Sequence, residues 1–259
     1  MTLRTRLRPL FLALGLAAAP LAAFGEEVVA GLSQNQVAIT ANFDGSDILI
    51  FGAVKREAPL PAGEPLQVIV AVSGPQVPVT VRRKTRQLGI WVNTDSVEVD
   101  SAPSFYAVAT SGPIAEILTN TQDLRYRVTT PRAIRSVGAP DTISDSENFT
   151  EALIRIRSEA GLYQLLEGTV DVTDQTLFST SISLPANLTE GEYTARIFLT
   201  RDGEVVDEFD TALDVRKVGL ERILYTLAHE QSLLYGLLSL AIAIAAGWGA
   251  SAVFSLLRK

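Results

Sequence analysis

The chain has 259 residues, with 22 basic and 29 acidic side chains, a net charge of −7 and no cysteine. The acidic balance argues against nucleic-acid binding, because phosphate backbones are contacted through clustered lysine and arginine. Without cysteine there are no disulfide bonds and no thiolate chemistry, so a folded body must be held by burial and backbone hydrogen bonds.

The N-terminal segment has the three parts of a secretory signal peptide. Arg4, Arg6 and Arg8 precede a short apolar run over residues 9–24, and small residues flank position 24. This arrangement predicts a signal peptide over residues 1–25 that is removed from the mature chain. Cleavage leaves 19 basic residues against 29 acidic ones. An uncleaved N-terminal anchor is the alternative.

The C-terminal segment is long and apolar enough to cross a membrane. Residues 233–257 contain no charged side chain, and about 20 such residues span a hydrocarbon core of roughly 30 Å as a helix. The basic pair at residues 258–259 favours a cytoplasmic end. The sequence therefore predicts a transmembrane helix over residues 232–257 with a cytoplasmic tail of residues 258–259. A buried helix of a soluble protein is the alternative.

Between these segments the apolar pattern predicts a mainly β body. Segments of alternating or β-branched residues recur every ten to fifteen residues, separated by Gly, Pro, Asn and Asp. The predicted strands are residues 36–40, 47–54, 66–73, 77–84, 90–92, 105–110, 165–172, 177–184, 191–200 and 204–215. We expect an antiparallel β-sandwich of immunoglobulin-like general shape, without the Cys-Trp-Cys pattern of disulfide-pinned members.

One segment inside the β body has the spacing of an amphipathic helix. Over residues 147–160, Phe149, Leu153 and Ile156 would share one apolar face. Gly161 follows at a position where it can end the helix. This predicts a helix inserted into the second half of the body.

The body divides into two predicted units with a soft boundary at residues 136–142. Residues 26–135 form the first β-sandwich unit, and residues 136–218 form a second β unit that contains the inserted helix. One continuous sandwich is the alternative. Residues 219–231 have an apolar stripe opposite charged residues, which predicts a juxtamembrane amphipathic helix at the membrane interface.

The sequence offers no catalytic, cofactor-binding or metal-binding motif. It contains no P-loop, G-x-G-x-x-G or G-x-S-x-G sequence, and its one histidine is His229. Asp141, Asp145 and Glu147 could offer oxygen ligands to calcium, but they lack EF-hand spacing, and loop solvation with helix capping explains them more simply. We therefore expect a protein that is not an enzyme and needs no cofactor.

Four cations gather within five residues of this acidic body, at Arg82, Arg83, Lys84 and Arg86. Such a cluster could bind a small anion or an acidic partner. The alternative is that they belong to a charged edge strand, since edge cations discourage sheet-to-sheet association.

The C-terminal apolar segment has small residues at every fourth position, at Ser239, Ala243, Gly247 and Ser251. Small-residue faces let transmembrane helices approach closely, so this stripe predicts lateral association with a second copy or with a multi-span protein. A plain alanine-rich anchor is the alternative. A second small-residue stripe consists of Ala241, Ala245 and Gly249.

Three stretches of the sequence show a family resemblance. They are GLSQNQVAITANFDGSDILIFGAV early in the body, FYAVATS at a strand end, and LYGLLSLAIAIAAGWGASAVF in the C-terminal segment. They resemble an alphaproteobacterial family of uncharacterised predicted transmembrane proteins. The resemblance implies a Gram-negative inner membrane, a periplasmic body and no established catalytic residues. It also implies a membrane partner, because family members are similar to proteins whose genes lie beside those of multi-span sulfite or sulfonate exporters of the TauE/SafE type.

Together these features predict a single-pass bacterial inner-membrane protein with a periplasmic β-sandwich domain and a cytoplasmic C-terminus. Its predicted role is that of a non-enzymatic accessory or interaction protein of a membrane complex, such as an exporter of sulfur oxyanions. A membrane-anchored module that binds small anions is the alternative. The expected partners are the lipid bilayer and, through the C-terminal helix, a membrane protein or a second copy.

Overall fold

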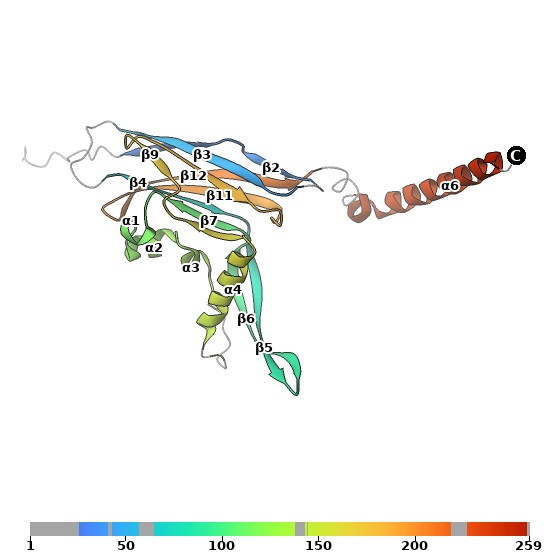
Figure 1. The fold of residues 1–259 in the computed structure, drawn as a ribbon, viewed down its shortest axis with the longest axis horizontal. Helices are drawn as coiled ribbons and strands as arrows, with labels where there is room; N and C mark the ends of the chain where they lie inside the picture. Colours follow the sequence, from blue (N-terminus) through green and yellow to red (C-terminus); the bar gives the residue numbers. More distant parts are fainter. Residues whose placement is uncertain are drawn as a thin grey trace, which may run out of the picture.

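The computed structural model contains a β-rich body and one long C-terminal helix, α6 (Ser232–Leu257), as Figure 1 shows. The mainly β fold with a C-terminal helix is confirmed. The structure describes residues 26–40, 43–56, 65–137, 143, 145–218 and 227–257, with side chains as far as residue 251. The predicted signal peptide and residues 219–226 of the predicted juxtamembrane helix lie outside the described residues.

The body is a sandwich of two sheets with a projecting hairpin. One sheet has the strand order β1-β3-β10-β9, the other has the order β2-β12-β11-β4-β7-β8, and β5 and β6 form a separate two-stranded sheet. The first sheet consists of β1 (Glu27–Leu32), β3 (Ser46–Lys55), β10 (Leu177–Leu184) and β9 (Asp171–Thr173). The second consists of β2 (Gln36–Ile39), β12 (Glu204–Lys217), β11 (Gly191–Arg201), β4 (Gln67–Ser73), β7 (Tyr106–Thr110) and β8 (Tyr163–Leu166).

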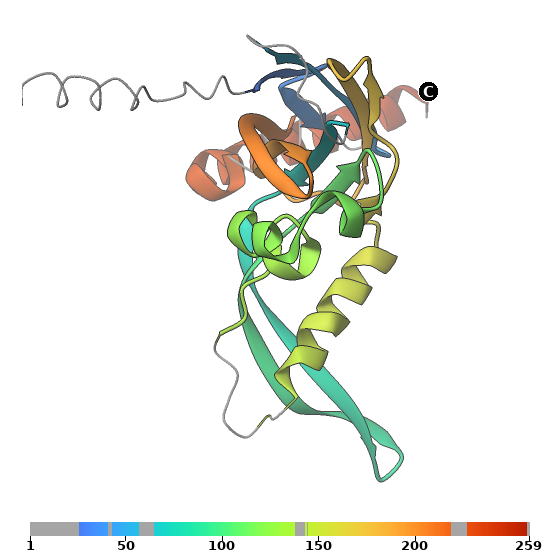
Figure 2. The ribbon, with the colours of Figure 1, turned by 90° about the vertical axis from the view of Figure 1, so that its left-hand side faces the viewer.

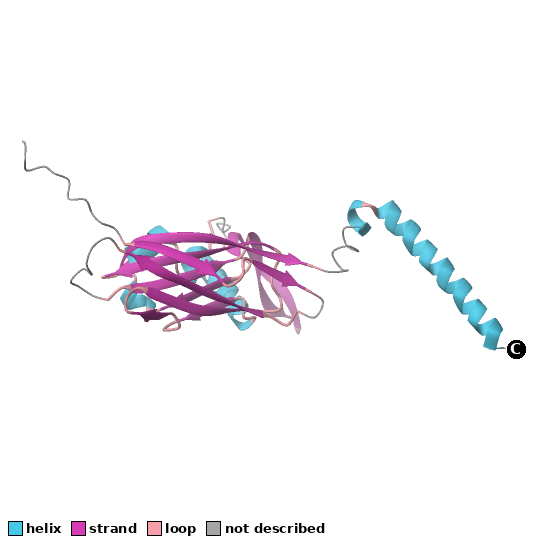
Figure 3. Ribbon diagram, turned by 90° about the horizontal axis from the view of Figure 1, so that it is seen from above, coloured by secondary structure: helices cyan, strands magenta, loops and turns pink. Residues whose placement is uncertain are grey.

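Most neighbouring strands are antiparallel, but the six-stranded sheet has a parallel pair at each edge, β2 with β12 and β7 with β8. Seen from above, the strands run along the long axis of the body, and α6 lies apart from them (Figure 3). A relation to immunoglobulin domains stays a prediction.

Strand β4 is buried on both of its faces. Val68, Val70 and Val72 enter the core between the two sheets, whereas Ile69 and Ala71 enter a second core on the outer face of the six-stranded sheet. A continuous run of β-branched residues is typical of a strand covered on both sides. The six-stranded sheet is therefore the middle layer of the molecule.

The second core is covered by short helices and by the base of the hairpin. The covering elements are α1 (Ile114–Ile117), α2 (Asn120–Tyr126), α3 (Thr130–Ala133), α4 (Ser146–Glu159), β5 (Gln76–Gln87) and β6 (Ile90–Pro103). Phe149 and Leu153 of α4 share this core with Val81 of β5 and with Val97 and Val99 of β6. Figure 2 shows α4 and the hairpin side by side.

The predicted helix over residues 147–160 is confirmed as α4, and Gly161 follows it with a φ of +71°. Its predicted apolar face is corrected at one position, because Ile156 is 55% exposed while Phe149 and Leu153 are buried. Phe149 and Leu153 pack against the hairpin. The next turn is held by Arg157, which donates hydrogen bonds to the Pro103 carbonyl and the Tyr163 hydroxyl, while Ile156 beside it faces solvent.

Strands from both predicted units share the same two sheets. β3 pairs with β10, β4 with β11, and β7 with β8. The strand expected over residues 165–172 is two strands, β8 and β9, which belong to different sheets. Gly168, with a φ of +69°, lies in the turn between them, where the chain crosses from one sheet to the other.

A nearly buried ion-pair cluster joins β1, β3 and β11. The Glu26 carboxylate accepts hydrogen bonds from Arg56 Nε at 2.6 Å and from an Arg201 guanidinium nitrogen at 2.9 Å. The Glu26 and Arg201 side chains are 10% exposed, and the Arg56 side chain is 12% exposed. Burial alone raises the pKa of Glu26, but the hydrogen bonds from Arg56 and Arg201 outweigh it and leave this pKa below its usual value.

We predict that Glu26→Gln lowers the free energy of unfolding by about 3 kcal/mol at pH 7, since two nearly buried guanidinium groups lose their carboxylate. The folded-state pKa of Glu26 is depressed, so its stabilisation is present above the unfolded pKa and is lost as the pH falls through the folded pKa. Urea unfolding at several pH values should therefore show the free energies of unfolding of the parent and of Glu26→Gln becoming equal in acid.

The neighbouring variant Glu27→Gln is the control for this measurement. Glu27 pairs with Lys55, and their side chains are 64% and 59% exposed. Loss of such a surface pair changes the free energy of unfolding by less than about 1 kcal/mol. Equal effects of the two variants, or a loss in Glu26→Gln that does not depend on pH, would contradict the assignment.

Candidate functional site

The β5–β6 hairpin projects from the body, as Figures 1 and 2 show. Its strands have 12 and 14 residues, and at about 3.3 Å per residue the arm is roughly 40 Å long. The base of the arm belongs to the second core. At the far end, Leu88 and Gly89 form the turn with φ values of +49° and +88°, which is the backbone of a tight two-residue hairpin turn.

The alternation of β5 divides the four predicted cations between the two faces of the hairpin. Arg83 faces α4, where its guanidinium pairs with Asp145, lies 3.8 Å from Asp95 and stacks 4.5 Å from the centroid of the Phe149 ring. Hydrogen bonds from Asn148 and then from Arg83 hold the pKa of Asp145 below its usual value. Arg83 therefore braces the hairpin against α4.

The other three cations, Arg82, Lys84 and Arg86, lie on the opposite face and are exposed. None of the three forms an ion pair with another described residue. The predicted patch is thus a row of three solvent-facing cations, and the charge of the fourth, Arg83, is balanced by carboxylates.

The candidate calcium ligands Asp141, Asp145 and Glu147 do not form a metal site in the part of the chain that the structure describes. Asp141 lies outside the described residues. Asp145 is held by Arg83 and Asn148. The described residues contain no group of three or more His, Cys, Asp or Glu side chains that could hold a metal ion. His229 lies in a helical turn just before α6.

The far end of the hairpin is apolar and exposed. Leu88 is fully exposed, Ile90 is 66% exposed and Trp91 is 69% exposed. The strand register places Trp91 opposite Arg86, and Ile90 opposite Gln87. The sequence pattern does not predict this exposed apolar end, because aromatic and β-branched residues in a strand pattern normally indicate burial.

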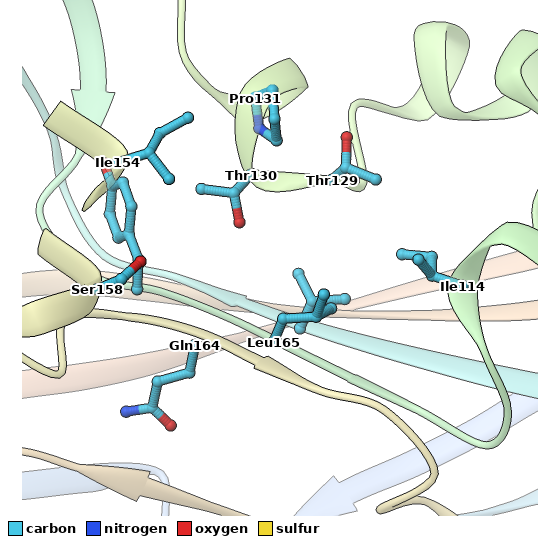
Figure 4. Close-up of a pocket in the computed structure, with 10 residues that line it drawn as sticks. Ile114, Thr129, Thr130, Pro131, Ile154, Ser158, Gln164 and Leu165 are labelled. Carbon is cyan, nitrogen blue, oxygen red and sulfur yellow. The ribbon is translucent and has the colours of Figure 1, made fainter. Parts of the chain in front are cut away.

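A cavity of about 410 Å³ lies among α3, α4, β7 and β8 (Figure 4). Its lining contains aliphatic side chains, hydroxyl groups and one amide, and none of these side chains has a formal charge. The lining residues are Val108, Ile114, Thr129, Thr130, Pro131, Ile154, Ser158, Tyr163, Gln164 and Leu165. Such a cavity suits a small uncharged molecule better than a free anion.

The hydroxyl group of Tyr163 in this cavity is already engaged. It donates to the Pro103 carbonyl at 2.8 Å and accepts from Arg157 at 3.0 Å. Burial raises the pKa of Tyr163 above its usual value, so the phenol stays protonated at neutral pH. The group holds β8 and α4 against the hairpin base.

A second hollow, of about 380 Å³, lies beside α2 and contains Arg196. The Arg196 guanidinium donates to the Tyr126 carbonyl at 2.8 Å and to the Arg127 carbonyl at 3.1 Å. It also lies 3.3 Å from the hydroxyl of Tyr106, which itself donates to the Val128 carbonyl at 2.8 Å. These bonds fix α2 on the sheet and engage both terminal nitrogens of the Arg196 guanidinium within the protein.

Helix α6 is exposed along its described length. Over Ser232–Ser251 the mean hydropathy is 1.8 and no residue is buried, unlike the core helix of a soluble protein. The predicted stripe of Ser239, Ala243, Gly247 and Ser251 is exposed on this helix. A Cβ added at Gly247 would meet no atom of the described chain within 4 Å. No packing inside the described chain therefore requires glycine there.

The profile of the protein family described as "Putative transmembrane protein (Alph_Pro_TM)" matches residues 27–256. No curated protein matches the sequence. Because the match covers nearly the whole body and α6, the chain belongs to this family. The family supports a membrane location for the chain and fits the apolar helix at its C-terminus.

We predict that Arg83→Gln destabilises the protein by about 0.5–1 kcal/mol through loss of its stacking on Phe149, whereas Arg82→Gln stays within about 0.5 kcal/mol of the parent. Urea unfolding gives both values, and hydrogen exchange of α4 should rise only in the Arg83 variant. Equal behaviour of the two variants would contradict the division of the cations between two faces.

Proposed function

We propose that this member of the family is a non-enzymatic accessory protein of a membrane complex, and that α6 binds a membrane partner through its small-residue face. The observation on which the proposal rests is the exposed stripe of Ser239, Ala243, Gly247 and Ser251 on a helix that no part of the described body covers.

Glycine in the middle of α6 supports a packing role for this helix. Glycine costs a helix about 1 kcal/mol relative to alanine, and no contact in the described chain explains Gly247 of this stripe or Gly249 of the second stripe. In a bilayer, small residues let two backbones approach until van der Waals contacts and weak hydrogen bonds form between them. A partner helix would therefore use the space above Gly247 that this chain leaves open.

The polar groups of the body support a binding role rather than catalysis. Tyr163 lines the first of the two cavities, and Arg196 lines the second. Internal hydrogen bonds hold both side chains. Their bonds position α2, α4 and β8, which are structural elements of the second core. The body then serves as a rigid domain attached to a membrane helix.

The proposed orientation places the body in the periplasm and the C-terminus in the cytoplasm. Its support is the signal-peptide pattern of residues 1–25 and the basic pair at residues 258–259. The family resemblance adds a multi-span exporter of sulfur oxyanions as the proposed partner. Such a protein would offer α6 several helices against which to pack.

Binding of small anions is the second candidate, and it has less support. Arg82, Lys84 and Arg86 are exposed cations without an ion pair to a described residue. They lie on an open two-stranded hairpin, where water competes for each contact. Arg83, the fourth predicted cation, is engaged by Asp145 and Asp95.

We predict that a photo-crosslinker in α6 captures a multi-span protein in native membranes, and that Ala243→Leu with Gly247→Leu lowers the captured amount roughly tenfold by preventing close approach. The matched control is Ala245→Leu with Gly249→Leu. Its two positions each lie two residues after Ala243 and Gly247. At about 100° per residue, the control therefore adds the same bulk about 200° around the helix from the tested face. Mass spectrometry of the crosslinked species gives both readings.

Two results would contradict the proposal. Equal loss from the two double variants would show that the stripe of Ala243 and Gly247 is not the contact face. Crosslinks to a second copy alone would show a homodimer instead of an accessory subunit.

A further inference from the structure

The hairpin leaves the body at the same end of the six-stranded sheet as the chain that continues to α6. The register places Ser73 of β4 beside Thr194 of β11, and Thr194 beside Ala212 of β12. β5 begins three residues after Ser73, and β12 ends five residues after Ala212, at Lys217. Figure 1 shows the hairpin descending from this end of the body.

The length of the connection to α6 limits how far this end of the body can lie from the membrane helix. Residues 218–231 connect β12 to α6, and 14 residues reach at most about 50 Å when fully extended. The hairpin itself is roughly 40 Å long. Its tip can therefore reach the surface of the bilayer that α6 spans when this end of the body lies within the length of the hairpin from it.

The tip differs in charge from the rest of the protein. Residues 84–94 contain Lys84, Arg86 and no acidic residue, in a chain whose net charge is −7. An acidic body is repelled by an anionic lipid surface, whereas a local cationic segment is attracted to it. The tip is thus the part of the domain that is suited to approach anionic headgroups.

The apolar side chains at the tip match the same surface. Trp91 and Ile90 are more than half exposed, and tryptophan prefers the boundary between headgroups and acyl chains. Leu88 occupies a turn position with a φ of +49°, where Gly, Asn or Asp fit better, and its side chain is fully exposed. No contact with the described chain explains a leucine there.

Edge protection explains only part of this composition. Cations on an edge strand discourage association with other sheets. An exposed tryptophan, isoleucine and leucine at the end of the same strand pair would promote it. The combination of cations with exposed apolar side chains fits a bilayer interface, where both kinds of group find partners.

We propose that Leu88, Ile90 and Trp91 insert into the interface of an anionic bilayer, with Lys84 and Arg86 on the lipid headgroups. The bilayer is the one that α6 spans, so the domain has two contacts with it and a fixed tilt. This inference goes beyond the proposed accessory role, because it requires α6 in a membrane but no protein partner for α6.

The chain suits a fluorescence test because it has only two tryptophans, Trp91 in the hairpin and Trp248 in α6. Full-length protein with Trp248→Phe retains Trp91 as the single reporter. We reconstitute it in vesicles of phosphatidylcholine with phosphatidylglycerol, using lipids brominated near the headgroup end of the acyl chain. The expected result is a blue-shifted emission with about twofold quenching by the brominated lipid, as for an interfacial tryptophan.

Charge variants test the role of the cations. Lys84→Gln with Arg86→Gln should return the quenching to the level seen in pure phosphatidylcholine vesicles. Lys55→Gln with Arg155→Gln removes the same charge from exposed positions on β3 and α4 and should leave the quenching unchanged. The reverse variant, Trp91→Phe with Trp248 retained, confirms that α6 has inserted.

Emission from Trp91 that brominated lipid does not quench and aqueous iodide quenches fully would overturn the proposal. If the tip instead binds a protein partner, purified vesicles lack that partner and the brominated lipid does not quench Trp91. The absence of quenching therefore counts against lipid insertion. Equal quenching in anionic and neutral vesicles would overturn the assignment of anionic headgroups to Lys84 and Arg86.

Discussion

Burial of the six-stranded sheet on both faces is the constraint on which the rest of the structure depends. Val68, Val70 and Val72 of β4 fill the core of the sandwich, and Ile69 and Ala71 on the other face need a second cover. With no disulfide available, this cover must come from packing alone. Helices α1 to α4 and the base of the hairpin supply it, which explains why the sandwich has a third layer.

The same cover determines where the functional surfaces lie. Val97 and Val99 anchor the hairpin in the second core, and Arg83 fixes it to α4 through Asp145 and Phe149. The arm is therefore braced over its lower half, while its apolar and cationic tip stays in solvent. The hairpin and the chain that continues to α6 leave the body at one end of the six-stranded sheet, so the proposed contacts with the bilayer would lie on one side of the domain.

The sequence predicted those elements whose pattern is local. The runs of β4 and β11, the helix α4 and the apolar α6 all lie where their periodicity placed them. The sequence predicts strand β6 only over residues 90–92. In the structure Arg83 pairs with Asp95 and Lys84 pairs with Asn93, so Thr94 has no partner in β5 and interrupts the alternation of β6. Exposure of Trp91 depends on how far the hairpin extends beyond α4, and exposure of Ile156 depends on which side of α4 faces the body; both are long-range properties that no local pattern contains.

The most direct measurement of the account is hydrogen exchange of the full-length protein in anionic nanodiscs, compared with neutral ones. The account predicts that the anionic lipid slows exchange in residues 84–94, while the turn after β11 at residues 202–203 is unchanged, because it lies at the opposite end of the sheet. β4 should exchange slowest in both. Slowing at residues 202–203, or none in the hairpin tip, would contradict a domain that faces the bilayer with the hairpin end.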